Sequence, residues 1–597
     1  KLNILFYVYI LKENLMKNKL YLLYFILLLF ACKDPDIRKI TILQTTDIHG
    51  AVLDYNFIEK TSMTASLASA ATYIKKVRGN NNPVVLLDNG DNLQGQPVVY
   101  YYNFIDTLSP HLNAEVMNYL KYDAATVGNH DIEAGHKVYD RLVKEYDFPL
   151  LAANAVEIKT GDPYFRPYTI IERNNLRIAV MGLTTPAVTS WLPYELYSGI
   201  EFRDMEKTAK KWMPVIKAEK PDLIVGLFHS GWDNAENRKK DGYDPDNSSS
   251  AAVAFNVPGF DIIFTGHDHR TANETILNSE GDPVLILNGG SRGENIARAD
   301  VILMGSGRKP VKKITGEIVD VEHYRPDRKY SDNFRKQENV VKEYVDKVIA
   351  VSKRDISSRD AFFGPSAFVE MIHSVQLAVS GADISFAAPL SFDVKISKGP
   401  VTVGDMFKLY RFENMLYTVS MTGEEIRKYL EFSYSQWLNT MKSPSDRLIK
   451  LRKDDNNNLV LIDGRAWLSN QAYNFDSAAG IDYTVDISKP VGSRIKITSL
   501  SGGSHFNPRN TYLVAVNSYR GNGGGGHFAK GAGIEPDQLK SRIISSTDKD
   551  LRYYILKDLE KRKEIDPLPR NNWKIVPDSW VKKAAPADYK LLFGETM

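Results

Sequence analysis

The sequence predicts an α/β protein in two parts. The first is a four-layer domain of two packed β-sheets flanked by helices, over residues 38–321, and a linker with a helix (322–354) joins it to a second αβ domain (355–592). Three observations support this. The chain of 597 residues is too long for one hydrophobic core, β-type and helical runs alternate up to about residue 320, and residues 322–337 are polar and poor in hydrophobic side chains.

The first part is expected to contain buried strands separated by amphipathic helices. Strands are expected at Ile37–Thr45, Pro83–Asp88, Asp123–Val127, Pro149–Ala153, Arg177–Leu183, Leu223–Phe228 and Ile262–Thr265. Helices are expected near Ser62–Val77, Leu112–Leu120 and His136–Glu145, and the later runs Pro283–Asn288 and Ala299–Met304 are typical of hairpins. In the linker, helical spacing is found at Val341, Tyr344, Val345, Val348 and Ile349.

The composition argues against a polymeric nucleic acid as the partner. The chain carries 76 Lys and Arg against 73 Asp and Glu, with a net charge of +3. Proteins that bind polyanions carry a strong basic surface, and this nearly balanced count does not predict one. A small ligand such as a single nucleotide remains compatible with it.

The N-terminal residues resemble an export signal. Lys17 and Lys19 precede a short apolar run, Leu20–Ala31, that ends directly before Cys32, the only cysteine of the chain. This pattern is typical of a bacterial lipoprotein, in which the cysteine is lipidated after cleavage. We therefore expect residues 1–31 to be an upstream extension and signal peptide, Cys32 to carry the only membrane anchor, and the protein to reach the periplasm or the cell surface.

Polar residues beside glycine follow five of the expected strands. These stretches are Thr46–Gly50, Asp88–Asp91, Gly128–His130, His229–Gly231 and Gly266–His269. Loops at the carboxyl edge of an α/β sheet are common places for catalysis, because the strands hold them rigidly. In Asp-x-His and His-x-His, residues two apart on a strand point to the same side. The five stretches therefore predict one cluster of ligands at one edge of the sheets.

Seven side chains of these stretches can hold two metal ions. Asp47, His49 and His269 would hold one ion, Asn129, His229 and His267 the other, and Asp91 would bridge them. Mixed imidazole and carboxylate ligands suit Zn, Mn, Fe or Co better than Mg or Ca. Two such ions about 3.5–4 Å apart can share a hydroxide nucleophile and stabilise both oxygens of a phosphoryl displacement.

His130 would face the phosphoryl group instead of the metals. There it could stabilise charge or protonate the leaving oxygen. Either Asp131 or Glu133 could orient its ring, and the sequence does not decide between them.

The five motifs, in this order, resemble the calcineurin-type metallophosphoesterases. With a C-terminal domain attached, the chain is similar to bacterial nucleotidases, over about residues 38–560. Further stretches resemble the 2′,3′-cyclic-nucleotide 2′-phosphodiesterase/3′-nucleotidase branch. They are Asp88–Asp91 with Gln94-Gly95, Ala387–Pro389, Tyr473–Asp476 and Asn517–Arg520. The resemblance implies a two-metal hydrolase acting on nucleotides, and the alternative within the family is a 5′-nucleotidase or UDP-sugar hydrolase. A different class, a surface lipoprotein that binds nucleotides without hydrolysing them, would be expected to lack some of the seven ligands.

The second domain is expected to bind the nucleoside. Asn517, Tyr519 and Arg520 precede four glycines, Gly523–Gly526, and glycine lets the backbone approach a ligand closely. The family resemblance implies that two aromatic rings sandwich the base, and Phe412 and Tyr519 stand at those positions. The arginine that the family carries after the Ala-Ala-Pro region is absent here, and Arg411, Arg520 or Lys395 could replace it.

Overall fold

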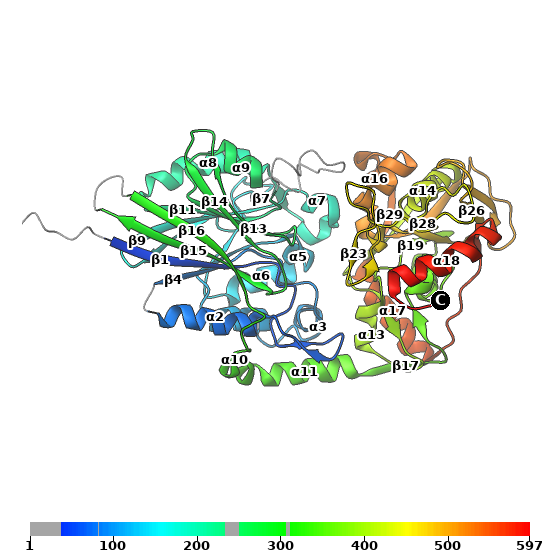
Figure 1. Cartoon of the computed structure of the whole chain (residues 1–597), viewed down its shortest axis with the longest axis horizontal. Helices are drawn as coiled ribbons and strands as arrows, with labels where there is room; N and C mark the ends of the chain where they lie inside the picture. The colour runs from blue at the N-terminus through cyan, green and yellow to red at the C-terminus, as the bar shows by residue number, and fades with distance from the viewer. Residues whose placement is uncertain (1–36, 81–82, 233–249, 306–310, 597) are drawn as a thin grey trace, which may run out of the picture.

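The computed structural model describes residues 37–80, 83–232, 250–305 and 311–596. Two domains lie side by side and are connected along one edge by helix α11 (Arg335–Asp346) (Figure 1). The expected signal segment and Cys32 lie outside the described residues. Of the helices within the described ranges, none combines the length and apolar character that crossing a membrane requires.

Two six-stranded sheets form the first domain. In spatial order the first sheet contains β16 (Val311–Asp320), β15 (Asn295–Met304), β1 (Ile37–Thr45), β4 (Val84–Asp88), β5 (Ala124–Thr126) and β6 (Leu150–Leu151). The second contains β13 (Thr271–Leu277), β14 (Pro283–Gly289), β12 (Ile262–Thr265), β11 (Leu223–His229), β9 (Leu176–Thr184) and β8 (Tyr168–Arg173). The strands that carry the polar motifs run parallel within each sheet, so their carboxyl ends share one edge.

Alternating side chains of each strand separate the domain into layers. In β11, Val225 and Leu227 belong to the core between the two sheets, whereas Ile224 and Phe228 face the helices outside. The second sheet is covered by α8 (Met205–Ala218) and α9 (Ser250–Asn256), and the first by α2 (Leu67–Gly79) and α4 (Leu112–Leu120). Burial on both faces explains the continuous apolar runs of these strands. The predicted architecture of two packed sheets flanked by helices is confirmed.

Several expected elements coincide closely with the structure. β1, α4, β12 and α6 (His136–Glu145) have the expected bounds, while α2 begins five residues later than expected, at Leu67. Ser66 explains that start, because its hydroxyl accepts from the Ala68 amide and caps the helix. The polar stretch after β5 was expected to lie in a loop, but Asn129–Glu133 forms a short helix, α5.

The connection between the domains differs from the expectation at its end. Helices α10 (Arg328–Asn333) and α11 are followed by strand β17 (Val348–Ser352), so Val348 and Ile349 do not continue the helix. β17 pairs with β21 (Gly399–Thr402) and β30 (Glu564–Ile565). Pairing with these distant strands outweighs the local helical spacing, and the sheet of the second domain therefore begins inside the expected linker.

A five-stranded sheet is the centre of the second domain. Its order is β25 (Ser477–Ala479), β19 (Ile384–Ala387), β28 (Thr511–Asn517), β22 (Met415–Thr422) and β29 (Ile543–Asp550). One face packs on α14 (Gly423–Trp437), and the other on α12 (Ala367–Ser380), α13 (Val403–Leu409) and α17 (Leu551–Arg562). A smaller sheet contains β27 (Ile495–Leu500), β26 (Ile481–Asp486) and β31 (Trp573–Val576). Helix α18 (Asp578–Phe593) follows β31, and α16 (Pro536–Arg542) directly precedes β29.

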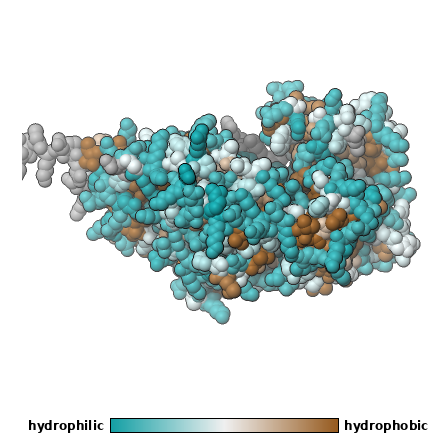
Figure 2. Space-filling view, turned by 90° about the horizontal axis from the view of Figure 1, so that it is seen from below, coloured by the Kyte–Doolittle hydropathy of each residue, from teal (hydrophilic) through white to brown (hydrophobic). Residues whose placement is uncertain are grey.

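The two domains contact each other at more than one place. In the short helix α3 (Pro97–Tyr100), the Tyr100 hydroxyl donates to Asp550 Oδ2 at 3.2 Å, and its ring packs edge-on against Phe407. Figure 2 shows a mostly hydrophilic face with separate apolar patches. At a second place of contact between the domains, Asn522 donates to the Trp191 carbonyl at 3.0 Å. Loops at the carboxyl edge of the first domain therefore contact the second domain.

Candidate metal centre

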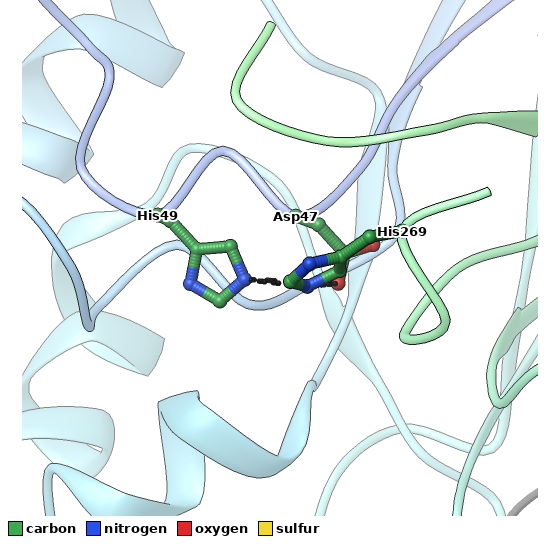
Figure 3. Close-up of side chains that lie close together, drawn as sticks. All are labelled: Asp47, His49 and His269. Carbon is green, nitrogen blue, oxygen red and sulfur yellow. Dashed lines mark hydrogen bonds and ion pairs between the residues drawn. The ribbon is translucent and has the colours of Figure 1, made fainter. Parts of the chain in front are cut away.

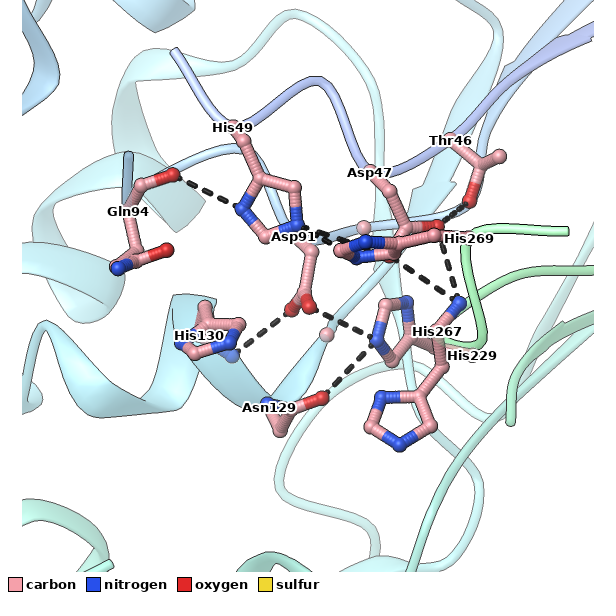
Figure 4. Close-up of polar contacts among 12 residues, drawn as sticks. Thr46, Asp47, His49, Asp91, Gln94, Asn129, His130, His229, His267 and His269 are labelled. Carbon is pink, nitrogen blue, oxygen red and sulfur yellow. Dashed lines mark hydrogen bonds and ion pairs between the residues drawn. The ribbon is translucent and has the colours of Figure 1, made fainter. Parts of the chain in front are cut away.

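All seven predicted ligands lie together at the carboxyl edge of the two sheets (Figure 4). Asp47 and His49 follow β1, Asp91 follows β4, and Asn129 follows β5. His229 ends β11, while His267 and His269 follow β12. The two sheets thus contribute ligands from opposite sides of the same edge.

The first group contains Asp47, His49 and His269 (Figure 3), with potential ligand atoms that lie within 4.8 Å of one another. His49 Nε2 lies 3.0 Å from His269 Nε2 and 3.9 Å from Asp47 Oδ1. His269 Nε2 lies 3.3 Å from Asp47 Oδ1. Two imidazoles and one carboxylate converging on a point form a donor set that suits a transition metal.

The second group contains Asp91, His229 and His267, also within 4.8 Å of one another. His229 Nε2 lies 3.2 Å from Asp91 Oδ2 and 3.1 Å from the amide oxygen of Asn129. Burial lowers the pKa of His49 in the first group to about 4, and the charge of Asp91 opposes this shift. The Asp91 carboxylate therefore affects a histidine of each group, His49 and His229. A carboxylate shared by two ions would be expected to lie near both groups in this way.

Backbone carbonyls orient two of the imidazoles. His49 Nδ1 lies 3.0 Å from the Gln94 carbonyl, and His229 Nδ1 lies 2.6 Å from the Asn89 carbonyl. A carbonyl only accepts, so each Nδ1 carries a proton, and in the neutral form of each ring the Nε2 lone pair faces the centre. This tautomer is the one that a metal ligand needs.

The electrostatics of the centre favour positive charge. Burial lowers the pKa of His229, but the carboxylates of Asp91 and Asp47 outweigh burial and raise it to about 10. Because Nδ1 donates to the Asn89 carbonyl, this raised pKa reflects a proton on Nε2, which faces Asp91 Oδ2 and Asn129 Oδ1. A divalent ion bound to these three atoms would supply the positive charge in place of that proton. The residues present therefore fit divalent ions, and their imidazole and carboxylate groups favour Zn, Mn, Fe or Co over Mg or Ca.

The backbone turns sharply at five of the seven predicted ligands. A left-handed conformation is found at Asp47 (φ 50°), His49 (φ 49°), Asp91 (φ 59°), His267 (φ 73°) and His269 (φ 57°). Such conformations are costly for residues with side chains and cluster at functional sites. The convergence of Asp47 with His49 thus comes from a turn after the strand, not from the strand alternation that the sequence suggested. At Gly128 a Cβ atom would collide with Asp91, so only glycine fits there.

Glu133 is the carboxylate that orients His130. Its Oε2 lies 2.5 Å from His130 Nδ1. Asp131 instead accepts the backbone amides of Asp91 at 2.9 Å, Asn92 at 2.9 Å and Gly128 at 2.8 Å. Burial lowers the pKa of His130, but Asp91 and Glu133 outweigh it and raise it to about 9. Glu133 therefore holds the His130 ring, and Asp131 holds the loop of the bridging ligand.

A cavity of about 700 Å³ lies between the domains beside this centre. His49, His130 and His269 line it from the first domain, and Arg411 and Phe412 from the second. Pockets of 300–1,000 Å³ are typical of small-molecule sites. The structure thus brings two of the five expected substrate-binding residues to the metal centre.

The other three expected substrate-binding residues have other contacts. Arg520 is 2% exposed, and its guanidinium donates to Asp476, Asn474 and the carbonyls of Tyr473 and Gly524. Every donor of Arg520 is therefore used within the fold, and it does not contact the cavity. Asn517 caps α15 (Ser518–Gly521) by accepting from the Arg520 amide at 2.8 Å.

Tyr519 does not form a stacked pair with Phe412. Tyr473 contacts both rings edge-on, with centroid distances of 5.9 Å to Phe412 and 6.2 Å to Tyr519. Among the described residues, Tyr519 is not part of the cavity lining.

Two residues near the centre were missed by sequence reasoning. The ring of Trp191, in helix α7 (Val188–Trp191), stacks on His267 with centroids 5.3 Å apart. Arg292 lines the cavity, and its amide donates to the Asp47 carbonyl at 2.7 Å. Both lie outside the polar motifs, and only their position in the folded chain connects them with the ligands.

Known proteins match both halves of the chain. Residues 40–271 match the family described as calcineurin-like phosphoesterase, and residues 347–531 match the 5′-nucleotidase C-terminal domain. A 2′,3′-cyclic-nucleotide 2′-phosphodiesterase/3′-nucleotidase of Salmonella typhimurium is 26% identical, over 90% of this chain and 88% of its own length. The trifunctional nucleotide phosphoesterase protein YfkN of Bacillus subtilis is 27% identical over 90% of this chain, which spans only 39% of YfkN.

Solved structures show the same fold over most of the chain. A putative 5′-nucleotidase from Staphylococcus aureus matches with a TM-score of 0.72 and 19% identity, covering 90% of this chain and 99% of its own. A 5′-nucleotidase precursor from Thermus thermophilus matches with a TM-score of 0.59 and 21% identity, covering 90% of this chain and all of its own. The chain therefore joins a calcineurin-like phosphoesterase domain to a 5′-nucleotidase C-terminal domain.

Proposed function

We propose that the protein is a metal-dependent phosphoester hydrolase that acts on nucleotides, as a 2′,3′-cyclic-nucleotide phosphodiesterase and 3′-nucleotidase. The observation that carries the proposal is the convergence of seven N and O ligands beside a cavity that both domains line. Relatives with this named activity align over about nine tenths of the chain.

Two divalent ions would be held by the side chains described above. One would bind to Asp47, His49 and His269, the other to Asn129, His229 and His267, with Asp91 between them. When bound, such ions activate water and neutralise phosphoryl oxygens. The protein supplies the orientation, since Gln94 and Asn89 fix two imidazole tautomers and Asp131 fixes the Asp91 loop.

His130 would act on the phosphoryl group. Its ring lines the cavity, and Glu133 holds Nδ1, so Nε2 is left to face the substrate. A protonated Nε2 can donate to a phosphoryl oxygen or give its proton to the leaving oxygen. The His130→Ala protein should keep its fold and its metal content but lose turnover by about 10²- to 10⁴-fold. Unchanged turnover would remove His130 from the mechanism.

Phe412 would contact the nucleobase. It lines the cavity from the second domain, and an aromatic face stacks on a base with little regard to its identity. The substrate would then extend from Phe412 to the metal centre and contact both domains.

Four substrates assayed side by side would test the specificity. The metal-loaded protein should hydrolyse 2′,3′-cyclic AMP and 3′-AMP faster than 5′-AMP and UDP-glucose. Faster turnover of 5′-AMP or UDP-glucose would favour the alternative, a 5′-nucleotidase or UDP-sugar hydrolase. Bound metal without hydrolysis of any phosphoester would instead indicate a binding protein.

We also propose that the protein is exported and anchored by a lipid on Cys32. The support is the sequence alone: two lysines, a short apolar run and then the only cysteine of the chain. Labelled palmitate should enter the wild-type protein in a bacterial host and be absent from the Cys32→Ala protein. Equal labelling of both would contradict the anchor.

A further inference from the structure

Two arginines, one from each domain, line the cavity beside the metal centre. Arg292 follows β14 in a turn, with a left-handed backbone (φ 55°), and its amide donates to the carbonyl of the ligand residue Asp47. Arg411 precedes Phe412, and its guanidinium lies 5.5 Å from the centre of that ring. Arg292 is thus fixed to the metal side of the cavity, and Arg411 to the side of the proposed base contact.

Neither guanidinium has an anionic partner in the described part of the chain. No hydrogen bond or ion pair joins the side chain of Arg292 or Arg411 to another described residue. Asp393, another charged residue of the cavity lining, is paired, with Arg359 at 2.5 Å. Arg520 and Arg552, the buried arginines nearby, are saturated by carboxylates and carbonyls.

The cavity also contains carboxylates, but they do not neutralise the arginine pair. Glu59, Glu294 and Glu322 line the same cavity, and within the described residues none of them forms an ion pair with Arg292 or Arg411. Arg411 in turn is affected by Arg292: desolvation in the cavity and, second, the charge of Arg292 lower the pKa of Arg411. Two cations that repel each other without a counter-ion are the expected lining of an anion site.

We propose that Arg292 and Arg411 form a second phosphate subsite, so that the preferred substrates are nucleotides that carry a phosphoryl group besides the one that is hydrolysed. This rests on the proposed function, because the hydrolysed group is assigned to the metal centre and His130. A phosphoryl dianion offers several acceptor oxygens, and guanidinium groups bind such oxygens in pairs. Adenosine 3′,5′-bisphosphate is the simplest such substrate: its 3′-phosphoryl group would lie at the metals and its 5′-phosphoryl group between the arginines.

The reaction expected with this substrate is hydrolysis at the 3′ position. The bond between phosphorus and the 3′ oxygen breaks, water supplies the new oxygen of the released phosphate, and the 3′ oxygen takes up a proton. The products are 5′-AMP and phosphate. Release of the 5′-phosphoryl group, which gives 3′-AMP, would contradict the proposed orientation.

A comparison of adenosine 3′,5′-bisphosphate with 3′-AMP tests the subsite, because the two differ only in the 5′-phosphoryl group. The metal-loaded wild-type protein should show a kcat/KM about tenfold or more higher for the bisphosphate. Arg292→Gln and Arg411→Gln should each remove most of that ratio. Arg292→Lys and Arg411→Lys, which keep the charge, should retain part of it. Lys496→Gln is the matched control and should keep the wild-type ratio, because Lys496 is an exposed cation of β27 that is not part of the cavity lining.

Either of two results would overturn the subsite. The first is a wild-type ratio near one, which shows that the 5′-phosphoryl group gains nothing. The second is an equal loss for both substrates in the glutamine variants, which assigns the arginines to the hydrolysed group instead.

A binding measurement separates failure of the subsite from failure of the proposed function. In the metal-loaded His130→Ala background, calorimetry should give a Kd about tenfold lower for the bisphosphate than for 3′-AMP, and Arg292→Gln or Arg411→Gln should remove the difference. If the wild-type protein hydrolyses neither compound, the proposed function fails, and this ratio of Kd values still decides whether the arginines bind a second phosphoryl group.

Discussion

The metal edge of the first domain and the glycine-rich loop of the second use polar residues in opposite ways. At the metal edge, the polar side chains of five motifs point toward one centre and leave their Nε2 and carboxylate lone pairs facing one another. In the loop after β28, Asn517 and Arg520 turn into the fold and satisfy each other and their neighbours. Polar residues beside glycine thus indicate a metal site when their ligand atoms converge on one point, and not when they are paired with donors and acceptors of the surrounding fold.

The difference has a physical cause. A buried guanidinium costs several kcal/mol unless it is paired, and Asp476 pairs with Arg520 at 2.9 Å, so the loop is stable without a ligand. At the metal edge, the carboxylates of Asp47 and Asp91 have imidazoles as neighbours and no Arg or Lys partner among the described residues. That edge therefore needs a cation from outside the chain.

The largest effect is expected from Asp91→Asn. The amide keeps the shape of the carboxylate but removes the charge that both metal groups share, so bound metal should fall from two ions toward one and kcat should fall by more than about 10³-fold. Elemental analysis and steady-state kinetics on the same preparation would measure both. Two retained ions with near wild-type turnover would contradict the bridging role, and with it the contrast between the two regions.

A pair of variants separates the two carboxylates beside His130. Glu133→Gln removes the charge that holds the His130 ring, so kcat should fall by about 10²- to 10³-fold with metal content unchanged. Asp131→Asn weakens the acceptor of four backbone amides around Asp91, so metal affinity should fall by about 10- to 100-fold while excess metal restores turnover. Metal titrations of activity would distinguish the two, and identical behaviour of both variants would contradict the separate roles.

How much the sequence predicts depends on whether a contact is local. The motifs at Asp47, His49 and Gly128–His130 were identifiable because each joins ligand chemistry to a strand end, and the parallel sheets then bring these ends together. The stacking of Trp191 on His267 and the presence of Arg292 in the same cavity as Arg411 were not identifiable. In each case the two residues are far apart in sequence, and only the packing of the folded chain brings them to one site.

The same distinction explains the errors in the second domain. Val348 and Ile349 have helical spacing, but strand pairing with β21 and β30 decides their conformation. Arg520 belongs to a loop motif that resembles a binding site, but its partner Asp476 lies 44 residues earlier, and only the fold brings the two together.

Arginine variants in the second domain would sharpen the contrast between buried and cavity-facing cations. Arg520→Ala leaves the Asp476 carboxylate buried and unpaired, and the free energy of unfolding should fall by about 3–5 kcal/mol. Arg411→Ala removes a side chain without an ion partner, and should change that free energy by less than about 0.5 kcal/mol. Urea denaturation of both variants would measure the difference. Equal destabilisation would place Arg411 among the structural residues and remove it from the cavity site.

The smallest effect is expected at the proposed base contact. Phe412→Ala removes one aromatic face from the cavity, and loss of base stacking worth about 1–3 kcal/mol should raise KM for 3′-AMP by roughly 5- to 150-fold. Hydrolysis of bis-p-nitrophenyl phosphate, which has no base, should fall much less, because the metal edge does not contact this ring. Tyr519→Ala is the matched comparison, since its ring contacts Tyr473 and does not line the cavity. A larger KM change in Tyr519→Ala than in Phe412→Ala would mean that the loop after β28 opens to the substrate, and that its polar residues change partners when a nucleotide binds.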